Sequence, residues 1–333
     1  MVESWEHEEV VTRLGRRSGV PVTVAVHSRR LGPAAGGIRL RQYPTWQDGL
    51  TDALRLSRAM TYKCAVAGVP FGGGKTVIAL PSPMSPSLRA DALADAGELI
   101  ASFGGTYLGG PDIGTGPDDM LYLRSYTDHV FCLPESHGGT GSSSGPTARG
   151  VLAALRAGMS AVFGTTSVAG RRVVVVGMGS VGSLLARELS AQGASVVAAD
   201  VDPARCAGYE QVDVASAYSL PADVLVPAAV GGVIGPDVRA PLVVGPANNQ
   251  LVSDDVAPVL AKAGVVWVPD FVASAGGVIY TLSREASGFD HDAALARVET
   301  IEETVRTVLA SDVDPLAAAV ALAERRLSSL ALT

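Results

Sequence analysis

The clearest pattern along the chain is an apolar run, a glycine-rich turn and an amphipathic segment in the second half. The run RVVVV at 172–176 is followed by GMGSVG and then by leucines 184, 185 and 189, which recur with helical spacing. A second apolar run, SVVAA at 195–199, ends at Asp200. This order predicts a βαβ unit. Further buried strands are indicated by the apolar runs at 223–229, 242–250 and 265–272.

In the first half, the order around the glycines is reversed. Residues 45–60, TWQDGLTDALRLSRAM, show helical periodicity behind the N-cap candidate Thr45, and a short strand is indicated by TVIAL at 76–80. An amphipathic stretch at 290–310 predicts C-terminal helices. Together the patterns predict an α/β protein of two domains with a cleft between them. One domain comprises 1–149 plus about 285–333, and the other comprises 150–284.

Composition narrows the function classes. The 333 residues are 47% hydrophobic and 18% charged, which is typical of a globular chain. The apolar runs are too short to span a membrane, and the acidic start MVESWEHEEV is unlike a signal peptide, so we expect a cytoplasmic protein. A net charge of −7 without a basic stripe argues against nucleic acid. Three scattered cysteines and five histidines without ligand-like spacing indicate a reducing compartment and no metal site.

The loop GMGSVG fits the dinucleotide-binding pattern G-x-G-x-x-G. Gly177 permits the tight turn, Gly179 lets the backbone approach a pyrophosphate, and Gly182 allows close packing of helix on strand. Asp200 stands 18 residues beyond Gly182, where a carboxylate would meet the ribose hydroxyls and repel a 2′-phosphate. The sequence therefore favours NAD over NADP, although Arg205 leaves NADP open.

Ligands of such sheets bind beyond the carboxyl ends of the strands. Ala228, Ala247, Asn248 and the loop at 273–277 follow predicted strands, so we expect them near the cofactor. Asparagine is also common in turns and helix N-caps, which is the alternative for Asn248.

The stretch GGGKT at 72–76 resembles a phosphate-binding loop, but it fails that pattern. The required first glycine would be residue 69, which is valine, and the order helix, turn, strand is reversed. Of 26 basic residues, 23 are arginine, and the lysines are Lys63, Lys75 and Lys262. Lysine can lose its proton in a protein whereas arginine cannot, so the pair Lys63 and Lys75 indicates a functional site. Chance placement of surface lysines is the alternative.

Two further glycine-rich loops belong to the first half. Gly36 and Gly37 form a close-approach pair in LGPAAGGIRL, and Asp112 lies in GGPDIGTGPDDM. Asp112 is either a turn or helix-cap residue, or it is part of a polar site with the lysines.

These segments resemble the glutamate/leucine/phenylalanine/valine dehydrogenase family, in particular its leucine, phenylalanine and valine branch. The resemblance covers roughly residues 20–325. It implies an N-terminal α/β domain for substrate binding and oligomerisation and a Rossmann domain for NAD. It also implies a homo-oligomer of at least two copies. The segments that carry it are LGPAAGGIR, AMTYKCAVAGVPFGGGKTVI, GGPDIGTGPDDM, GMGSVG, GPANNQL and PDFVASAGGVI.

The resemblance implies roles for individual residues. Lys63, with the backbone at Gly36 and Met60, would bind the substrate carboxylate. Lys75 would be the catalytic lysine, and Asp112 would hold it and relay protons. Two lysines sharing one site repel, and closure of the site desolvates them, so we expect the pKa of Lys75 to fall from about 10.4 toward roughly 7–8. The glycines before Lys75 would let the backbone approach the substrate closely.

Other implied site residues are apolar or small. The substrate side chain would meet Ala35, Gly110, Gly145, Val305 and Val308, and this small lining favours a large apolar side chain such as that of phenylalanine or tryptophan. The nicotinamide end would lie near Thr147 and Ser274. Ser180 and Val181 would complete the glycine loop, and Val201 would lie beside Asp200.

The implied reaction is reversible oxidative deamination of an L-amino acid with NAD⁺ to the 2-oxo acid, ammonium and NADH. The chain departs from the usual family pattern at Ser274, where asparagine is common, at Gly145-Pro146, and at Ala228, where cysteine is common. Three alternatives stay open: a branched-chain dehydrogenase, a specialised reductase of an imine or unusual amino acid, and a non-catalytic NAD-binding protein.

Overall fold

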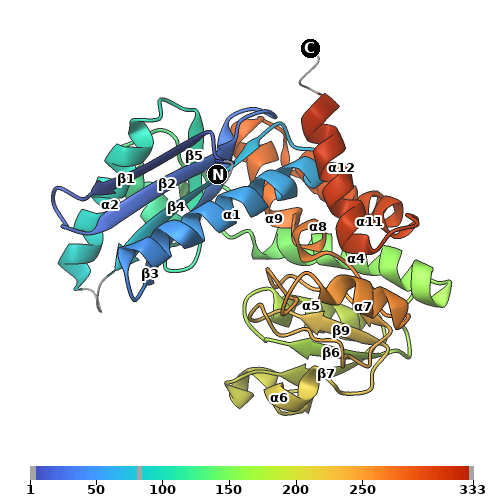
Figure 1. The fold of residues 1–333 in the computed structure, drawn as a ribbon. Helices are drawn as coiled ribbons and strands as arrows, with labels where there is room; N and C mark the ends of the chain where they lie inside the picture. The colour runs from blue at the N-terminus through green and yellow to red at the C-terminus, as the bar shows by residue number, and fades with distance from the viewer. Residues whose placement is uncertain (1–4, 81–84, 330–333) are drawn as a thin grey trace. The chain divides into compact units, whose positions relative to one another are not determined.

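The computed structural model describes residues 5–80 and 85–329, and it divides into two compact units (Figure 1). The first unit runs as far as Ser142 and also contains Thr281–Phe289 and the chain from Ala323 onward. The second unit contains Ser143–Tyr280 and Asp290–Leu322. Within the described residues, no helix combines the length and the apolar character that a membrane crossing requires.

The first unit is built on a five-stranded mixed sheet with the order β1-β2-β4-β3-β5. β4 runs parallel to β3 and antiparallel to β2, and β3 also runs parallel to β5. The strands are β1 (Glu9–Leu14), β2 (Pro21–Ser28), β3 (Ala34–Gln42), β4 (Gly72–Leu80) and β5 (Tyr107–Pro111). The helical segments are α1 (Trp46–Ala67), α2 (Pro86–Ala101), α3 (Pro117–Leu123), η1 (Glu135–His137) and the π-helical turn η3 (Leu282–Ala286).

Helix α1 covers one face of this sheet. Its N-cap is Thr45, as predicted: the Thr45 hydroxyl accepts from Asp48 N, and the Asp48 carboxylate accepts from Thr45 N. Successive side chains of a strand alternate between faces, and Val77 and Ala79 of β4 pack with Ala53 of α1. Lys75 lies two residues before Val77, so it shares the α1 face. The opposite face packs against α2 and α3.

The second unit contains a parallel sheet with the order β11-β10-β9-β6-β7-β8. Counted from β6, this is the order 3-2-1-4-5-6 of a dinucleotide-binding Rossmann fold, which confirms the predicted class of this sheet. Its strands are β6 (Arg172–Val176), β7 (Ser195–Ala199), β8 (Glu210–Gln211), β9 (Val224–Pro227), β10 (Leu242–Val243) and β11 (Val266–Trp267). The last two are only two residues long, shorter than the apolar runs suggest.

The helices of the second unit begin with a long one that precedes the first strand. They are α4 (Ser144–Phe163), α5 (Gly182–Ala191), η2 (Pro203–Cys206), α6 (Val214–Ala217), α7 (Val256–Lys262), α8 (Asp270–Ala273), α9 (Gly276–Thr281), α10 (His291–Glu299) and α11 (Ile301–Leu309). Helix α12 (Pro315–Ser329) crosses the division between the units at Leu322.

The C-terminal helices α10 and α11 belong to a different unit from the one that the sequence predicted. Residues 290–322 belong to the second unit, whereas the sequence placed everything from about 285 with the first. The physical reason is packing on α4, where Arg156 forms ion pairs with Glu299 and Glu302, and Ile301 is buried. Helical periodicity predicts an apolar face but not the element that covers it.

Candidate active site and dinucleotide site

The candidate catalytic pair of the first unit is Lys75 with Asp112. Lys75 lies on β4, every residue of which is buried, and its ammonium forms an ion pair with the carboxylate of Asp112, directly after β5. The loop that carries Asp112 is fixed by Thr115, whose hydroxyl accepts from Asp112 N at 2.9 Å and donates to Ile38 O at 2.8 Å. Two residues 37 positions apart in the sequence are thus brought together by the sheet.

A third charged residue, Arg39, contacts Asp112 of this pair. Arg39 was not predicted as a site residue from the sequence. Arg39 Nε donates to Asp112 Oδ2 at 3.0 Å, and its Nη1 donates to Asp52 Oδ2 at 2.9 Å. Asp52 also accepts from the hydroxyl of Tyr43 at 2.7 Å and from Arg55 at 2.8 Å. Alternation along β3 does place Arg39 on the same face as Gly37, which is the signal that could have revealed it.

The titration of the pair follows from this arrangement. Burial lowers the pKa of the Lys75 ammonium below its ordinary value; the Asp112 charge opposes that shift and Arg39 adds to it. Burial alone would raise the pKa of Asp112, but the charges of Lys75 and Arg39 outweigh burial and hold it at about 2. The direction for Lys75 agrees with the prediction. Arg39 is a neighbouring cation that contributes to this shift and that the sequence did not reveal, while the contribution expected from Lys63 stays a prediction.

The glycines around Lys75 are required by packing. A Cβ at Gly73 would lie 2.1 Å from Thr61 N of α1, and one at Gly74 would lie 2.6 Å from the ring of Tyr107. A Cβ at Gly36 would lie 1.8 Å from the Gly74 carbonyl oxygen. Atoms of α1, β2 and β5 therefore occupy the positions that a Cβ would take at Gly72, Gly73 and Gly74. The close approach of this backbone to a substrate stays a prediction.

The residues implied for the substrate carboxylate lie close by in the fold. Lys63 and Met60 are partly buried on α1, and Thr61, which contacts Gly73, stands between them. Gly36 lies on β3, next to β4 in the sheet. Their binding role stays a prediction.

The glycine loop of the second unit has the geometry that a dinucleotide needs. Gly177 has φ 103°, which favours glycine, and a Cβ at Gly182 would lie 1.8 Å from the Gly177 carbonyl oxygen. A Cβ at Gly179 would meet no atom of the described chain within 4 Å, so this backbone is open to a ligand. The carboxylate of Asp200 accepts from Met178 N at 2.7 Å, which ties the end of β7 to the glycine loop.

Other predicted cofactor residues follow the neighbouring strands. Ala228 comes directly after β9, and its N–H donates to Val176 O at 2.7 Å, at the point where the strand order reverses. Ala247 is buried, whereas Asn248 and Val201 are exposed. Ser180 and Val181 lie in the turn before α5. All these positions are at the carboxyl ends of strands in the second unit.

Thr147 and the loop at Ser274 are also brought together. A Cβ at Gly277 would lie 2.6 Å from Thr147 Oγ1, and one at Gly276 would lie 2.3 Å from the Pro146 carbonyl oxygen. The start of α9 therefore packs directly on the first turn of α4. Ser274 itself is buried and caps α8 through its N–H to Asp270 O.

The residues predicted to line the side-chain pocket are divided between the two units. Ala35 is buried on β3, but the ring of Phe131 lies 2.5 Å from a Cβ at Gly110, so that glycine leaves no room. Val305 and Val308 are buried in α11 of the second unit. In contrast, a Cβ added to Gly145 would find open space, with no described atom within 4 Å.

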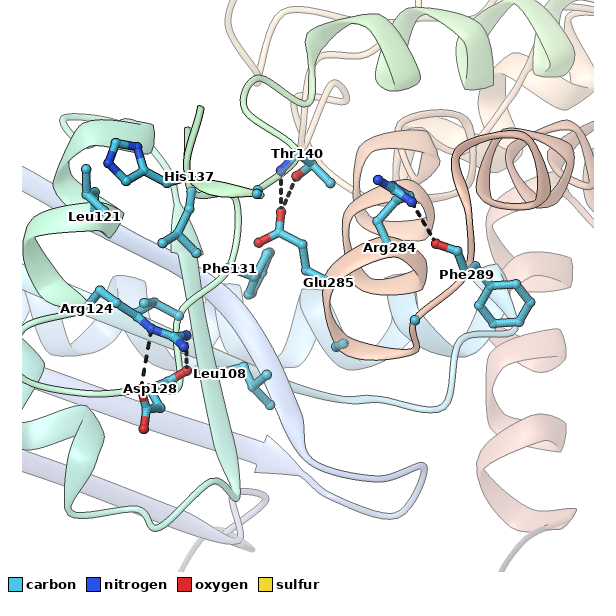
Figure 2. A pocket seen from close by; sticks show the side chains of 16 residues that line it. Leu108, Leu121, Arg124, Asp128, Phe131, His137, Thr140, Arg284, Glu285 and Phe289 are labelled. Carbon is cyan, nitrogen blue, oxygen red and sulfur yellow. Dashed lines mark hydrogen bonds and ion pairs between the residues drawn. The ribbon is translucent and has the colours of Figure 1, made fainter. Parts of the chain in front are cut away.

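A separate cavity of about 610 Å³ lies in the first unit (Figure 2). Its lining does not include Lys63, Lys75 or Asp112. The Glu285 carboxylate of η3 accepts from Cys132 N at 2.9 Å and from Thr140 N at 2.7 Å, and it also bonds the Thr140 hydroxyl. Figure 2 shows Glu285 facing Thr140, with Arg284 turned toward Phe289. Glu285 thus anchors η3 to the segment around η1, between α3 and α4.

Comparison with known proteins decides the family. Residues 9–129 match the dimerisation domain of Glu/Leu/Phe/Val dehydrogenases, and residues 200–328 match the Glutamate/Leucine/Phenylalanine/Valine dehydrogenase domain. The chain belongs to this family. Residues 173–225 also match the TrkA-N domain.

Similar proteins align with this chain along nearly its whole length. A leucine dehydrogenase of Bacillus cereus is 35% identical, with 99% of this chain and 93% of that protein covered. A phenylalanine dehydrogenase of Thermoactinomyces intermedius is 35% identical, with 92% and 86% covered. The crystal structure of L-tryptophan dehydrogenase from Nostoc punctiforme has a TM-score of 0.82 at 30% identity and covers 98% of each chain. This chain is thus an amino acid dehydrogenase, an oxidoreductase that uses NAD.

Proposed function

We propose that the protein catalyses the reversible oxidative deamination of an apolar, aromatic L-amino acid to its 2-oxo acid and ammonium, with NAD⁺ as the hydride acceptor. The observation that carries this proposal is the ion pair between Lys75, on the buried strand β4, and Asp112, directly after β5, within the region that matches the family's dimerisation domain.

Lys75 is the proposed general base. In the deamination direction it removes a proton from the water that attacks the substrate imine carbon, and for this it must be neutral. Burial lowers its pKa in the required direction. Asp112 orients the amine through the ion pair. Lys63 is proposed to bind the substrate carboxylate, together with the backbone at Gly36 and Met60.

The glycine loop of the second unit fits the pyrophosphate of NAD. Gly179 leaves its backbone approachable, and the N-terminus of α5 follows at Gly182. The backbone N–H of Asp202 and that of Met178 lower the pKa of Asp200, so it is a carboxylate at neutral pH and can accept from ribose hydroxyls. The nearby Arg205 is already paired with Asp202 at 3.4 Å, which reduces its use for a 2′-phosphate.

We propose an aromatic substrate side chain because residues of the proposed pocket are small. Ala35 and Gly145 carry little side-chain volume, and the open space at Gly145 supports room for a large substrate group. Gly110 adds nothing, because Phe131 fills its open side. A difference of one or two methylenes in such a pocket is worth only about 1–3 kcal/mol, so we expect several apolar amino acids to react.

A branched-chain substrate is the second candidate. The leucine dehydrogenase of Bacillus cereus and the phenylalanine dehydrogenase of Thermoactinomyces intermedius are both 35% identical to this chain, so overall similarity does not separate the two substrate classes. A specialised reductase is favoured only by Ser274 and Gly145. We further propose a homo-oligomer formed through the first unit, because residues 9–129 match a dimerisation domain.

The test is NADH formation from NAD⁺ at alkaline pH with single L-amino acids: Phe, Trp, Tyr, Leu, Val, Met and Glu. The proposal expects the highest kcat/KM with an aromatic substrate. Preference for Leu or Val would replace it with the branched-chain function. If no member reacts while NAD binds, the specialised reductase or the non-catalytic alternative takes its place.

The role of Lys75 is tested by Lys75→Ala against Lys262→Ala. Lys262 is exposed at the end of α7, so its loss should leave turnover unchanged. Lys75→Ala should lower kcat by about 10² to 10⁴-fold, the usual contribution of a general base. Unchanged turnover in Lys75→Ala would remove Lys75 from the mechanism.

A further inference from the structure

Four charged side chains form an alternating row on the α1 face of the first unit. Lys75 pairs with Asp112, Asp112 with Arg39, and Arg39 with Asp52 of α1. Their side chains are 7%, 20%, 11% and 13% exposed, so water screens them little. Arg55, which is 52% exposed, pairs with Asp52 at the outer end of the row.

Arg39 is the member that links the catalytic pair to the rest of the row. Its Nε and Nη1 bond different carboxylates, at 3.0 Å and 2.9 Å, and this fork fixes the guanidinium in one orientation. Asp52 is held in turn by Tyr43 and Arg55. A lysine could not reproduce both directed contacts with the same geometry.

We propose that Arg39 is a positioning residue that fixes Asp112 as a permanent carboxylate aimed at Lys75, so that Lys75 alone takes up and releases the proton. This inference rests on the proposed function, and it differs from the expectation that Asp112 relays protons. Both cations bond the same oxygen of Asp112, Oδ2, so protonation of that oxygen would break both contacts. The two positive charges also favour the ionised form of the carboxylate. Asp112 therefore acts through charge and orientation.

The charges with the largest effects on the pKa of Lys75 come from three elements. They are Asp112 after β5, Arg39 on β3 and Asp52 on α1, while the residue paired with Lys75 on β2 is the uncharged Ala25. Arg39 lowers the pKa of Lys75, and its charge also lowers that of Asp112. Removing the Arg39 charge should therefore raise both pKa values.

The experiment measures kcat/KM against pH, from about 6 to 11, with the best amino acid substrate. In Arg39→Met, the inflection at which activity rises with pH should move upward by about one unit, so that the loss approaches tenfold below the wild-type inflection and shrinks at high pH. Arg39→Lys keeps the cation and should keep the inflection near its wild-type position. Arg55→Met is the matched control, because Arg55 pairs with Asp52 at the end of the row away from Lys75, and the inflection of this variant should not move.

A purely structural role predicts a different result. It would lower activity by the same factor at every pH in Arg39→Met, or shift the inflection equally in Arg55→Met, and either outcome overturns the inference. If Arg39→Met does not fold, Arg39→Gln removes the charge while keeping a hydrogen-bond donor, and the same shift is expected.

The three lysines of the chain permit a readout that needs no turnover. In protein labelled with ¹³C and ¹⁵N at lysine, Lys63, Lys75 and Lys262 give three side-chain signals, and Lys75→Ala assigns the one of interest. Its titration midpoint should rise in Arg39→Met, and an unchanged midpoint would contradict the role of Arg39. If wild-type protein shows this titration but deaminates no amino acid, the proposed function fails while the link between Arg39 and Lys75 stands.

Discussion

Replacing Gly37 by alanine should damage the catalytic pair while leaving the sheet intact. The new Cβ would lie 2.7 Å from Asp112 Cβ, 3.2 Å from Asp112 Cγ and 3.0 Å from Lys75 Nζ. Ordinary contacts begin near 3.4 Å, so Asp112 must retreat by about 0.7 Å, the difference between 3.4 and 2.7. A misplacement of about 1 Å at reacting groups can cost on the order of 10²-fold in rate. Overpacking of this size also costs about 1–3 kcal/mol of stability.

The assay compares kcat, KM and thermal unfolding of Gly37→Ala with those of Gly116→Ala. Gly116→Ala is the control, because it adds the same methyl group at a position where a Cβ meets no described atom within 4 Å. We expect Gly37→Ala to lose kcat by about 10²-fold while remaining folded, and Gly116→Ala to stay close to wild type. The reasoning is refuted if Gly37→Ala keeps kcat within about threefold of wild type, because the pair would then tolerate the displacement.

Two further substitutions test the cofactor loop and the π-helical turn. Asp200→Asn removes the carboxylate that accepts from Met178 N, so the preference for NAD over NADP in kcat/KM should fall by about tenfold; an unchanged ratio would show that Asp200 does not set it. Glu285→Gln should lower the free energy of unfolding by about 1.5–3 kcal/mol in urea titration, because an ionised acceptor for Cys132 N and Thr140 N is lost. An unchanged free energy of unfolding would mean that the hydrogen bonds of Glu285 do not stabilise the fold.

The helix cap and the glycine turn were predicted correctly because each depends on residues that are close in the sequence. Thr45 caps α1 through a residue three positions away, and the turn at Gly177 and the contact between Gly182 and Gly177 arise within one βαβ unit. The pairing of Lys75 with Asp112 came from the family resemblance. Spacing alone left Asp112 as either a turn residue or part of a site.

Arg39 was missed because its partners are set by the order of the strands. It is 73 residues from Asp112 in the sequence, and the contact exists only because β3 lies between β4 and β5. Hydrophobic periodicity gives each strand its faces but not its neighbours. The same limit applies to α10 and α11, whose apolar faces were evident while their partner α4 was not.

The buried row of charges explains how one environment serves both stability and chemistry. Replacing a buried ion pair by apolar residues is often neutral or stabilising, so stability alone does not account for a lysine on a strand whose nine residues are all buried. That burial lowers the pKa of Lys75, as the proposed base requires, and the same burial would favour neutral Asp112. The positive charge of Arg39 lowers both pKa values. It stabilises the ionised form of Asp112 and destabilises the protonated form of Lys75. A second cation beside the acid therefore keeps more of Lys75 in the neutral form that a general base needs, while Asp112 stays ionised.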